Sequence, residues 1–185
     1  MNRSLKRPLT LFLLLTLLLL TGCTKISDGL SLSVCTGGKP ESLDPIHATD
    51  PGEQTILNHL YENLMRVTAD ASGRTSVTNG LAKSVDMEEE TVEGGVAVTY
   101  TFRLRTARWS DGQAVKASDF VYAWQRLADP ANNSPYADLL SCVSGFSEAR
   151  ETGDMSLLQV SAKNDSPLIV VLNGRHDWFL KEVCT

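Results

Sequence analysis

Histidine and serine side chains are the first candidates for covalent or metal chemistry in this sequence. The three histidines, His47, His59 and His176, lie far apart, and no G-x-S-x-G, P-loop or H-E-x-x-H pattern accompanies them. Ester or peptide hydrolysis, nucleotide binding and zinc-dependent hydrolysis each depend on such a spacing. We therefore assign no catalytic residue, no metal and no cofactor, and a hydrolase is kept only as the alternative to a binding protein.

The cysteines are the next candidates. Cys35, Cys142 and Cys184 have no C-x-x-C spacing, so a structural zinc site is not expected. Cys35 and Cys142 are predicted to be buried small side chains, and a disulfide between them remains the alternative outside the cytosol. The fourth cysteine, Cys23, has a different setting.

Cys23 closes an N-terminal segment that is typical of an export signal. Positive residues at 3, 6 and 7 precede an apolar run of about a dozen residues, which is shorter than the roughly 20 needed to span a bilayer. Leu20-Thr21-Gly22-Cys23 resembles the lipobox of bacterial lipoproteins. The cysteine of a lipobox is acylated with fatty acids such as palmitate and becomes the mature N-terminus. We therefore expect lipidation at Cys23 and a lipid anchor at the cell membrane, facing the periplasm or the exterior. An unprocessed anchor and plain secretion are the alternatives.

The charge balance excludes one class of partner. The chain has 17 Lys and Arg against 22 Asp and Glu, and removal of residues 1–22 with their three positive charges leaves 14 against 22, a net charge of about −8. An acidic exported protein is not attracted to nucleic acid or to anionic lipid.

The elements after the signal alternate between strand and helix patterns. Period-two alternation predicts strands at 30–36 and 96–104, and shorter apolar stretches predict strands at Val160 and at 168–172. The acidic run 88–90 with Glu93-Gly94-Gly95 is expected to be an exposed hairpin tip. Turns are predicted at 70–73, 109–112 and 164–166.

Three helices are predicted from apolar spacing and caps. One begins at Asp50-Pro51 with a capping box to Glu53 and is expected to end near Met65. A second starts near Ser118, the only residue there that could cap it, and stops at 129–130, burying Phe120, Val121 and Trp124. A third runs from 136 to about 148, and Asp177 could cap a last short helix. Trp109, in the 109–112 turn, is expected to be packed.

Several blocks in this order resemble the N-terminal part of the extracytoplasmic solute-binding proteins of ABC transporters, family 5, known for binding oligopeptides or dipeptides. The blocks are Ser42-Leu43-Asp44-Pro45, 60–64, 80–82, 100–105, Trp109-Ser110-Asp111-Gly112, 115–130 and Ser134-Pro135-Tyr136-Ala137. Together they cover about residues 30–180, and most of them specify the scaffold rather than the ligand.

The resemblance implies an α/β fold of the periplasmic-binding-protein-like type II. Members of the family are several hundred residues long, with two lobes that close on the ligand, so this chain is expected to be a fragment that holds only the N-terminal portion of lobe I and cannot clamp a ligand alone. The implied organisation is a signal at 1–22, a lipidated terminus and linker at 23–29, and a partial lobe I at 30–185. A stand-alone short structural lipoprotein is the alternative.

The resemblance also implies a function and a site. The function is capture of peptides and their delivery to the membrane permease and ATPase of an ABC importer; sugars, opines and metal chelates are the alternative solutes. Candidate ligand contacts are Thr49, Asp50, Pro51 and Tyr136. The loop departs from the oligopeptide-binding pattern at Thr49 and Pro51, and Pro51 has no N–H to donate to a peptide. Asp50 could bind a ligand amine, although a helix cap is the simpler role.

Overall fold

The computed structural model describes Ser33, Cys35 and residues 38–185. The predicted signal, the lipidation site Cys23 and almost all of the strand expected at 30–36 lie outside the described residues. Residues 36–185 form one compact unit. Across the part of the chain that the structure describes, no helix is long and apolar enough to cross a membrane.

Helix α2 (Pro51–Leu60) begins as the sequence predicts. Asp50 accepts a hydrogen bond from Gly52 N–H at 2.7 Å, Pro51 occupies the first turn, and Glu53 completes the capping box. The helix ends earlier than expected, because Tyr61 is extended and Met65 already pairs in a strand. Leu60, at the end of the helix, is 63% exposed, whereas Leu64 is buried in the core. The apolar spacing that suggested a longer helix therefore includes residues that lie after the helix, in the chain that leads to the core.

Two antiparallel sheets follow. Strands β1 (Met65–Ala69) and β2 (Thr75–Asn79) form a small hairpin around the predicted turn at 70–73. The main sheet has the order β3-β4-β6-β5. Its strands are β3 (Ala82–Val92), β4 (Gly95–Leu104), β5 (Val160–Ala162) and β6 (Leu168–Leu172).

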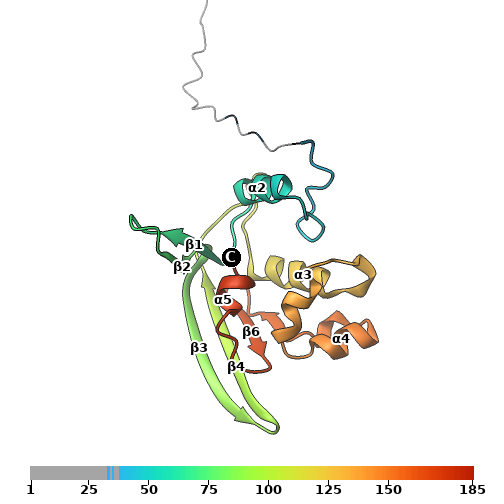
Figure 1. Ribbon diagram of the computed structural model, residues 1–185. Helices are drawn as coiled ribbons and strands as arrows, with labels where there is room; N and C mark the ends of the chain where they lie inside the picture. Colours follow the sequence, from blue (N-terminus) through green and yellow to red (C-terminus); the bar gives the residue numbers. More distant parts are fainter. Residues whose placement is uncertain (1–32, 34, 36–37) are drawn as a thin grey trace, which may run out of the picture. The chain divides into compact units, whose positions relative to one another are not determined.

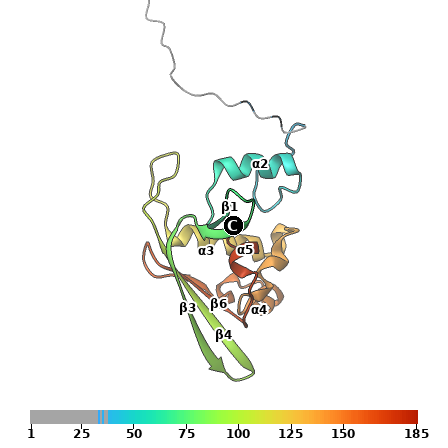
Figure 2. The same cartoon turned by 60° about the vertical axis from the view of Figure 1, so that its left-hand side comes forward.

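The β3–β4 hairpin corrects one prediction. Glu88, Glu89 and Glu90 are not at its tip but within β3, paired with β4, and the turn is at 93–94. The three acids remain exposed, because this end of the hairpin reaches past β5 and β6 into solvent (Figure 2). The predicted strands at 96–104, 160 and 168–172 are confirmed.

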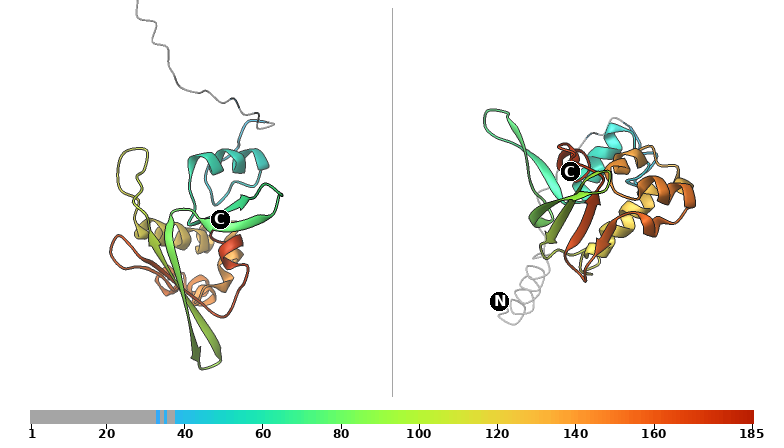
Figure 3. Two further views of the ribbon diagram at one scale, coloured as in Figure 1. Left: turned by 90° about the vertical axis from the view of Figure 1, so that its left-hand side faces the viewer. Right: turned by 90° about the horizontal axis from the view of Figure 1, so that it is seen from below.

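The remaining helices lie on the β6 side of the main sheet (Figure 1). They are α3 (Ala117–Ala128), α4 (Phe146–Thr152) and α5 (Phe179–Glu182), with 3-10 turns at Pro130–Asn132, Ala137–Cys142 and Met155–Leu157. Within this compact unit, helix α2 lies at the end opposite the tip of the β3–β4 hairpin (Figure 3). The prediction of one helix at 136–148 is wrong. Val143 is extended and pairs with Leu172 of β6, so the stretch is divided into the 3-10 turn at Ala137–Cys142 and helix α4.

The core lies between the main sheet and these helices. Phe179 is fully buried, with its ring centroid 4.9 Å from that of Tyr100 and edge-on to Trp124 at 6.2 Å. Trp124 is buried as predicted, whereas Phe120 and Val121 are half-buried at the edge of the core. Asp177 does not cap α5, whose N-cap position is Trp178.

The cysteines differ from the prediction at one position. Cys142 is buried as expected, but Cys35 is exposed, and both are free thiols. Cys184 is buried as well. Burial raises the pKa of the Cys142 thiol to about 11 and raises that of Cys184 still further, since a thiolate would lose its hydration there. Neither thiol is activated as a nucleophile.

Candidate functional site

An open groove of about 810 Å³ lies between the C-terminal end of α2 and the N-terminal half of α3. Its apolar lining includes Leu57, Leu64, Phe120 and Trp124, and polar groups stand among them. Concave apolar surfaces with a few polar groups are the usual form of ligand sites. Among the described residues, no group of histidine, cysteine and acidic side chains could hold a metal ion.

The groove is bordered by a loop at residues 41–50, which we call the rim loop. Pro45 and Ala48 of this loop line the groove, together with Gln54 of α2 and Tyr136. Its conformation is irregular, with a turn at 45–47 in which His47 and Ala48 donate their N–H groups to the Asp44 carbonyl at 2.9 and 3.0 Å. Such a loop depends on side chains from elsewhere to hold it in place.

Glu53 closes the rim loop at its base. Its Oε1 accepts the N–H groups of Glu41 and Ser42 at 2.7 and 2.8 Å, and its Oε2 accepts that of Asp50 at 3.3 Å. Glu53 is the only charged side chain buried among the described residues, at 4% exposure. These hydrogen bonds lower the pKa of the Glu53 carboxyl, and the bond from Ser42 contributes most. The carboxylate therefore stays ionised and joins the two ends of the loop.

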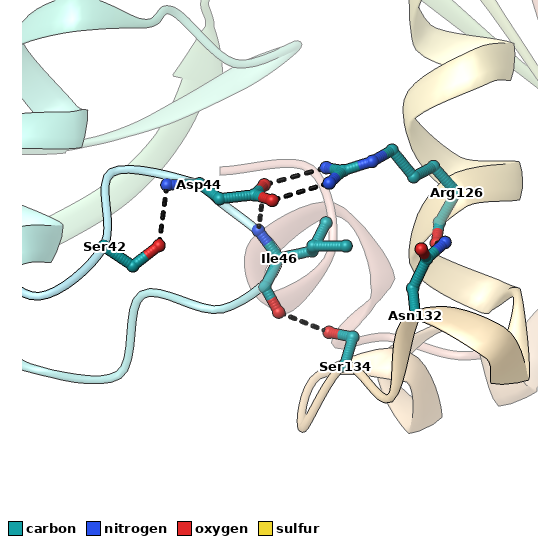
Figure 4. A network of polar contacts seen from close by, with 6 residues as sticks. All are labelled: Ser42, Asp44, Ile46, Arg126, Asn132 and Ser134. Atoms are coloured by element: carbon teal, nitrogen blue, oxygen red, sulfur yellow. Dashed lines mark hydrogen bonds and ion pairs between the residues drawn. The ribbon is translucent and has the colours of Figure 1, made fainter.

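A bidentate ion pair fixes the middle of the rim loop to α3. The Asp44 carboxylate accepts hydrogen bonds from both terminal nitrogens of Arg126, at 2.8 and 2.6 Å (Figure 4). Hydrogen bonding to Arg126 lowers the pKa of Asp44. Two residues further on, Ser134 Oγ donates to the Ile46 carbonyl at 2.6 Å, also seen in Figure 4. A planar guanidinium suits this geometry because both of its donors meet one carboxylate.

Tyr136 reaches the same loop. Its hydroxyl donates to the Ala48 carbonyl at 2.8 Å and accepts from Gln54 Nε2 at 3.1 Å. The structure therefore holds Tyr136 between Ala48 and Gln54, on either side of the sequence-predicted Thr49, Asp50 and Pro51, which are exposed and do not line the groove. Asp50 is the cap of α2, and the Tyr136 hydroxyl is engaged within the chain, so this side chain offers the groove its ring.

Trp109 occupies the other border of the groove. It is 41% exposed rather than packed, and its Nε1 donates to Asp119 Oδ2 at 3.0 Å. The same oxygen accepts Lys116 N–H at 3.0 Å at the start of α3. Asp119 thus performs the capping role that the sequence had suggested for Ser118, since its carboxylate reaches back from the third helical position.

Glu62 forms a further cluster that sequence reasoning missed. It pairs with Arg66 and, at 2.5 Å, with Arg105, and both Glu62 and Arg66 line the groove. Arg105 ends the alternating strand pattern and Glu62 follows α2, so their pairing depends on the fold. The roles of Glu53 and Arg126 were missed for the same reason, although the capping-box position of Glu53 was visible in the sequence.

Solved structures of similar fold define the class of protein. The chain matches Haemophilus influenzae OppA in complex with the peptide RPPGFSPFR at a TM-score of 0.65 and 33% identity, over 78% of this chain and 27% of that one. The Escherichia coli murein tripeptide binding protein MppA matches at a TM-score of 0.64 and 30% identity, over 77% of this chain and 26% of that one. The chain is therefore a mixed α/β portion of a periplasmic-binding-protein-like fold.

The sequence comparisons identify the family. Residues 77–182 match the model of bacterial extracellular solute-binding proteins, family 5. The oligopeptide-binding protein OppA of Bacillus subtilis is 34% identical over 152 residues, 80% of this chain and 26% of that protein. The chain belongs to family 5 of the bacterial extracellular solute-binding proteins, and it spans about a quarter of the length of the curated relatives it matches.

Proposed function

We propose that this chain is part of the solute-binding component of an ABC importer, which captures peptides outside the cytoplasm and delivers them to the membrane permease and its ATPase. The observation that carries the proposal is the apolar groove bordered by the rim loop, in a chain whose relatives include OppA of Bacillus subtilis. A peptide fits such a site because main-chain groups can be recognised while side chains vary.

The proposed ligand contacts are Thr49, Asp50, Pro51 and Tyr136. Tyr136 lines the groove and is half-buried, whereas Thr49, Asp50 and Pro51 are exposed in the chain that directly follows the groove-lining Ala48, and this placement supports the assignment. The N–H of Asp50 already donates to Glu53, and Pro51 has no N–H. These two residues can therefore accept hydrogen bonds from a ligand but have no free amide to donate. The ring of Tyr136 would add an apolar contact.

A titration with short peptides tests the proposal. The isotopically labelled chain is titrated with trialanine and trilysine, and amide chemical shifts are followed by NMR. Since the chain is expected to hold only part of lobe I, it should bind peptides weakly and without closing on them, with shifts confined to the rim loop and the groove and of similar size for the two peptides. Shifts produced by a sugar or a metal chelate and by neither peptide would overturn the peptide assignment.

We further propose that residues 1–22 are a removed signal, that Cys23 carries the lipid anchor, and that residues 30–185 form the binding part. The acylated cysteine would hold the protein at the membrane, because two or more acyl chains bind a bilayer stably whereas one does so marginally. Metabolic labelling with palmitate in a bacterial host tests this. Label should enter the wild-type chain and be lost in Cys23→Ser, and equal labelling of both would contradict the proposal.

A further inference from the structure

The side chains of the rim loop alternate between two environments. Residues 42, 44, 46 and 48 are half-buried or buried, whereas Leu43, Pro45, His47 and Thr49 are exposed. The inner set carries the contacts with the rest of the protein, through the N–H of Ser42, the carboxylate of Asp44 and the carbonyls of Ile46 and Ala48. The inner set thus holds the loop, and it places Pro45 of the outer set and Ala48 of the inner set at the groove.

We propose that Glu53 and the Asp44–Arg126 pair are positioning residues for ligand binding, which hold the rim loop in the form that places Pro45 and Ala48 at the groove. This inference rests on the proposed function. Glu53 and Arg126 act through the loop and need not touch the solute.

The anchors come from two parts of the chain and act at different points of the loop. Glu53, from α2, joins residues 41 and 42 to residue 50 and so fixes the base. Arg126, from α3, fixes the middle at Asp44, 82 residues away in sequence. Each anchor joins a carboxylate, that of Glu53 or that of Asp44, to more than one donor, so it is stronger than a single neutral hydrogen bond. Losing either one frees a different part of the same loop.

Ordering the loop in advance matters for binding. A loop that must be immobilised by the ligand reduces the observed affinity, because part of the binding free energy is used to order it. Within the rim loop itself, which the structure describes in full, the main-chain hydrogen bonds run only from His47 and Ala48 to Asp44, so the loop's place against the groove depends on the side chains that hold it from outside. The affinity for a solute is therefore expected to depend on Glu53 and Arg126 even though neither is proposed to contact it.

The experiment compares Glu53→Gln, Arg126→Ala and Arg126→Lys in the full chain, with Arg103→Ala as the matched control. Arg103 also pairs with an aspartate, Asp86, but on the β3–β4 hairpin far from the rim loop in sequence. Hydrogen exchange of residues 41–50 is measured by mass spectrometry, with β4 and β6 as internal references, and the affinity for trialanine is measured by NMR titration.

We expect amide exchange of residues 41–50 to rise at least tenfold in Glu53→Gln and Arg126→Ala, with β4 and β6 unchanged. The affinity for trialanine should fall at least fivefold in both variants. Arg126→Lys, which keeps the charge but loses the bidentate contact, should be intermediate on both measures and thereby show partial rescue. Arg103→Ala should match the wild type.

Two results would overturn the positioning role: unchanged exchange in residues 41–50, or increased exchange with unchanged affinity for trialanine. In the second case the proposed function stands and only the positioning role fails. If neither peptide shifts any signal of the wild-type chain, peptide binding by this groove fails instead, and exchange in residues 41–50 still decides whether Glu53 and Arg126 hold the loop. If Glu53→Gln does not fold, the two Arg126 variants decide the matter.

Discussion

Substitution of Gly80 by alanine should strongly destabilise the protein, because the added Cβ would push Gly80 away from the backbone of residues 63–65. A Cβ at Gly80 would lie 2.4 Å from the Asn63 carbonyl oxygen and 3.1 Å from that of Leu64. Both obstacles are backbone, so no side-chain rotation relieves the overlap. The chain here is also tied by hydrogen bonds to Leu64 O from Gly80 N–H at 2.9 Å and Ala82 N–H at 3.0 Å.

The size of the effect follows from the overlap and from these bonds. Overpacking in a close-packed interior costs about 1–3 kcal/mol, and each backbone hydrogen bond that lengthens forfeits part of about 0.5–1.5 kcal/mol. Against this, replacing glycine restricts the unfolded chain and stabilises by roughly 0.4–1 kcal/mol. We therefore expect Gly80→Ala to lower the free energy of unfolding by about 2–4 kcal/mol.

Urea denaturation followed by circular dichroism measures this difference, and Gly174→Ala is the matched control. A Cβ at Gly174 meets only His176 Nε2, at 3.8 Å, which is ordinary contact. The control should therefore be unchanged or slightly stabilised. If Gly80→Ala lies within about 0.5 kcal/mol of Gly174→Ala, the range typical of neutral surface changes, the close backbone approach at Gly80 is refuted.

The remaining predictions concern protonation and thiol reactivity. In an NMR pH titration the pKa of Asp44 should lie below its ordinary value of 3.8, and Arg126→Ala should raise it toward that value; an unshifted Asp44 would exclude the ion pair. Because its folded pKa is the lower one, the stability that Asp44 contributes is present above pH 3.8 and is lost as the pH falls through the folded pKa. In native protein at pH 8, iodoacetamide should modify Cys35 rapidly, whereas Cys142 and Cys184 should react only after unfolding; equal labelling by mass spectrometry would contradict their burial.

Local signals in the sequence were sufficient for some of the structure. The start of α2 was predicted because its capping box involves residues only three positions apart, and β4 because alternation over nine residues reflects one buried face. The end of α2 was not predictable in this way. Leu64 continues the helical spacing, but it is buried in the core beside β1 instead, and packing overrides local propensity there.

The candidate site was predicted only in part, for a related reason. Tyr136 and the residues at 49–51 were placed together by resemblance, and the structure does bring Tyr136 to Ala48. The Asp44–Arg126 pair links positions 82 apart in sequence, and the contact between Ser134 and Ile46 spans 88. No spacing rule connects such positions, so these contacts required the fold.

The three glutamates at 88–90 have a consequence for how the protein behaves at high concentration. Strand β3 is at the edge of the main sheet, and exposed edge strands offer unpaired main-chain groups to other molecules. Met87 and Val92, on either side of the acids, are exposed and would favour such pairing. Two copies aligned edge to edge along β3 would bring their glutamate runs together, and the repulsion opposes the contact. Glu89 is paired with Arg175 within the chain, so we expect Glu88 and Glu90 to supply most of the charge that opposes pairing between β3 edges.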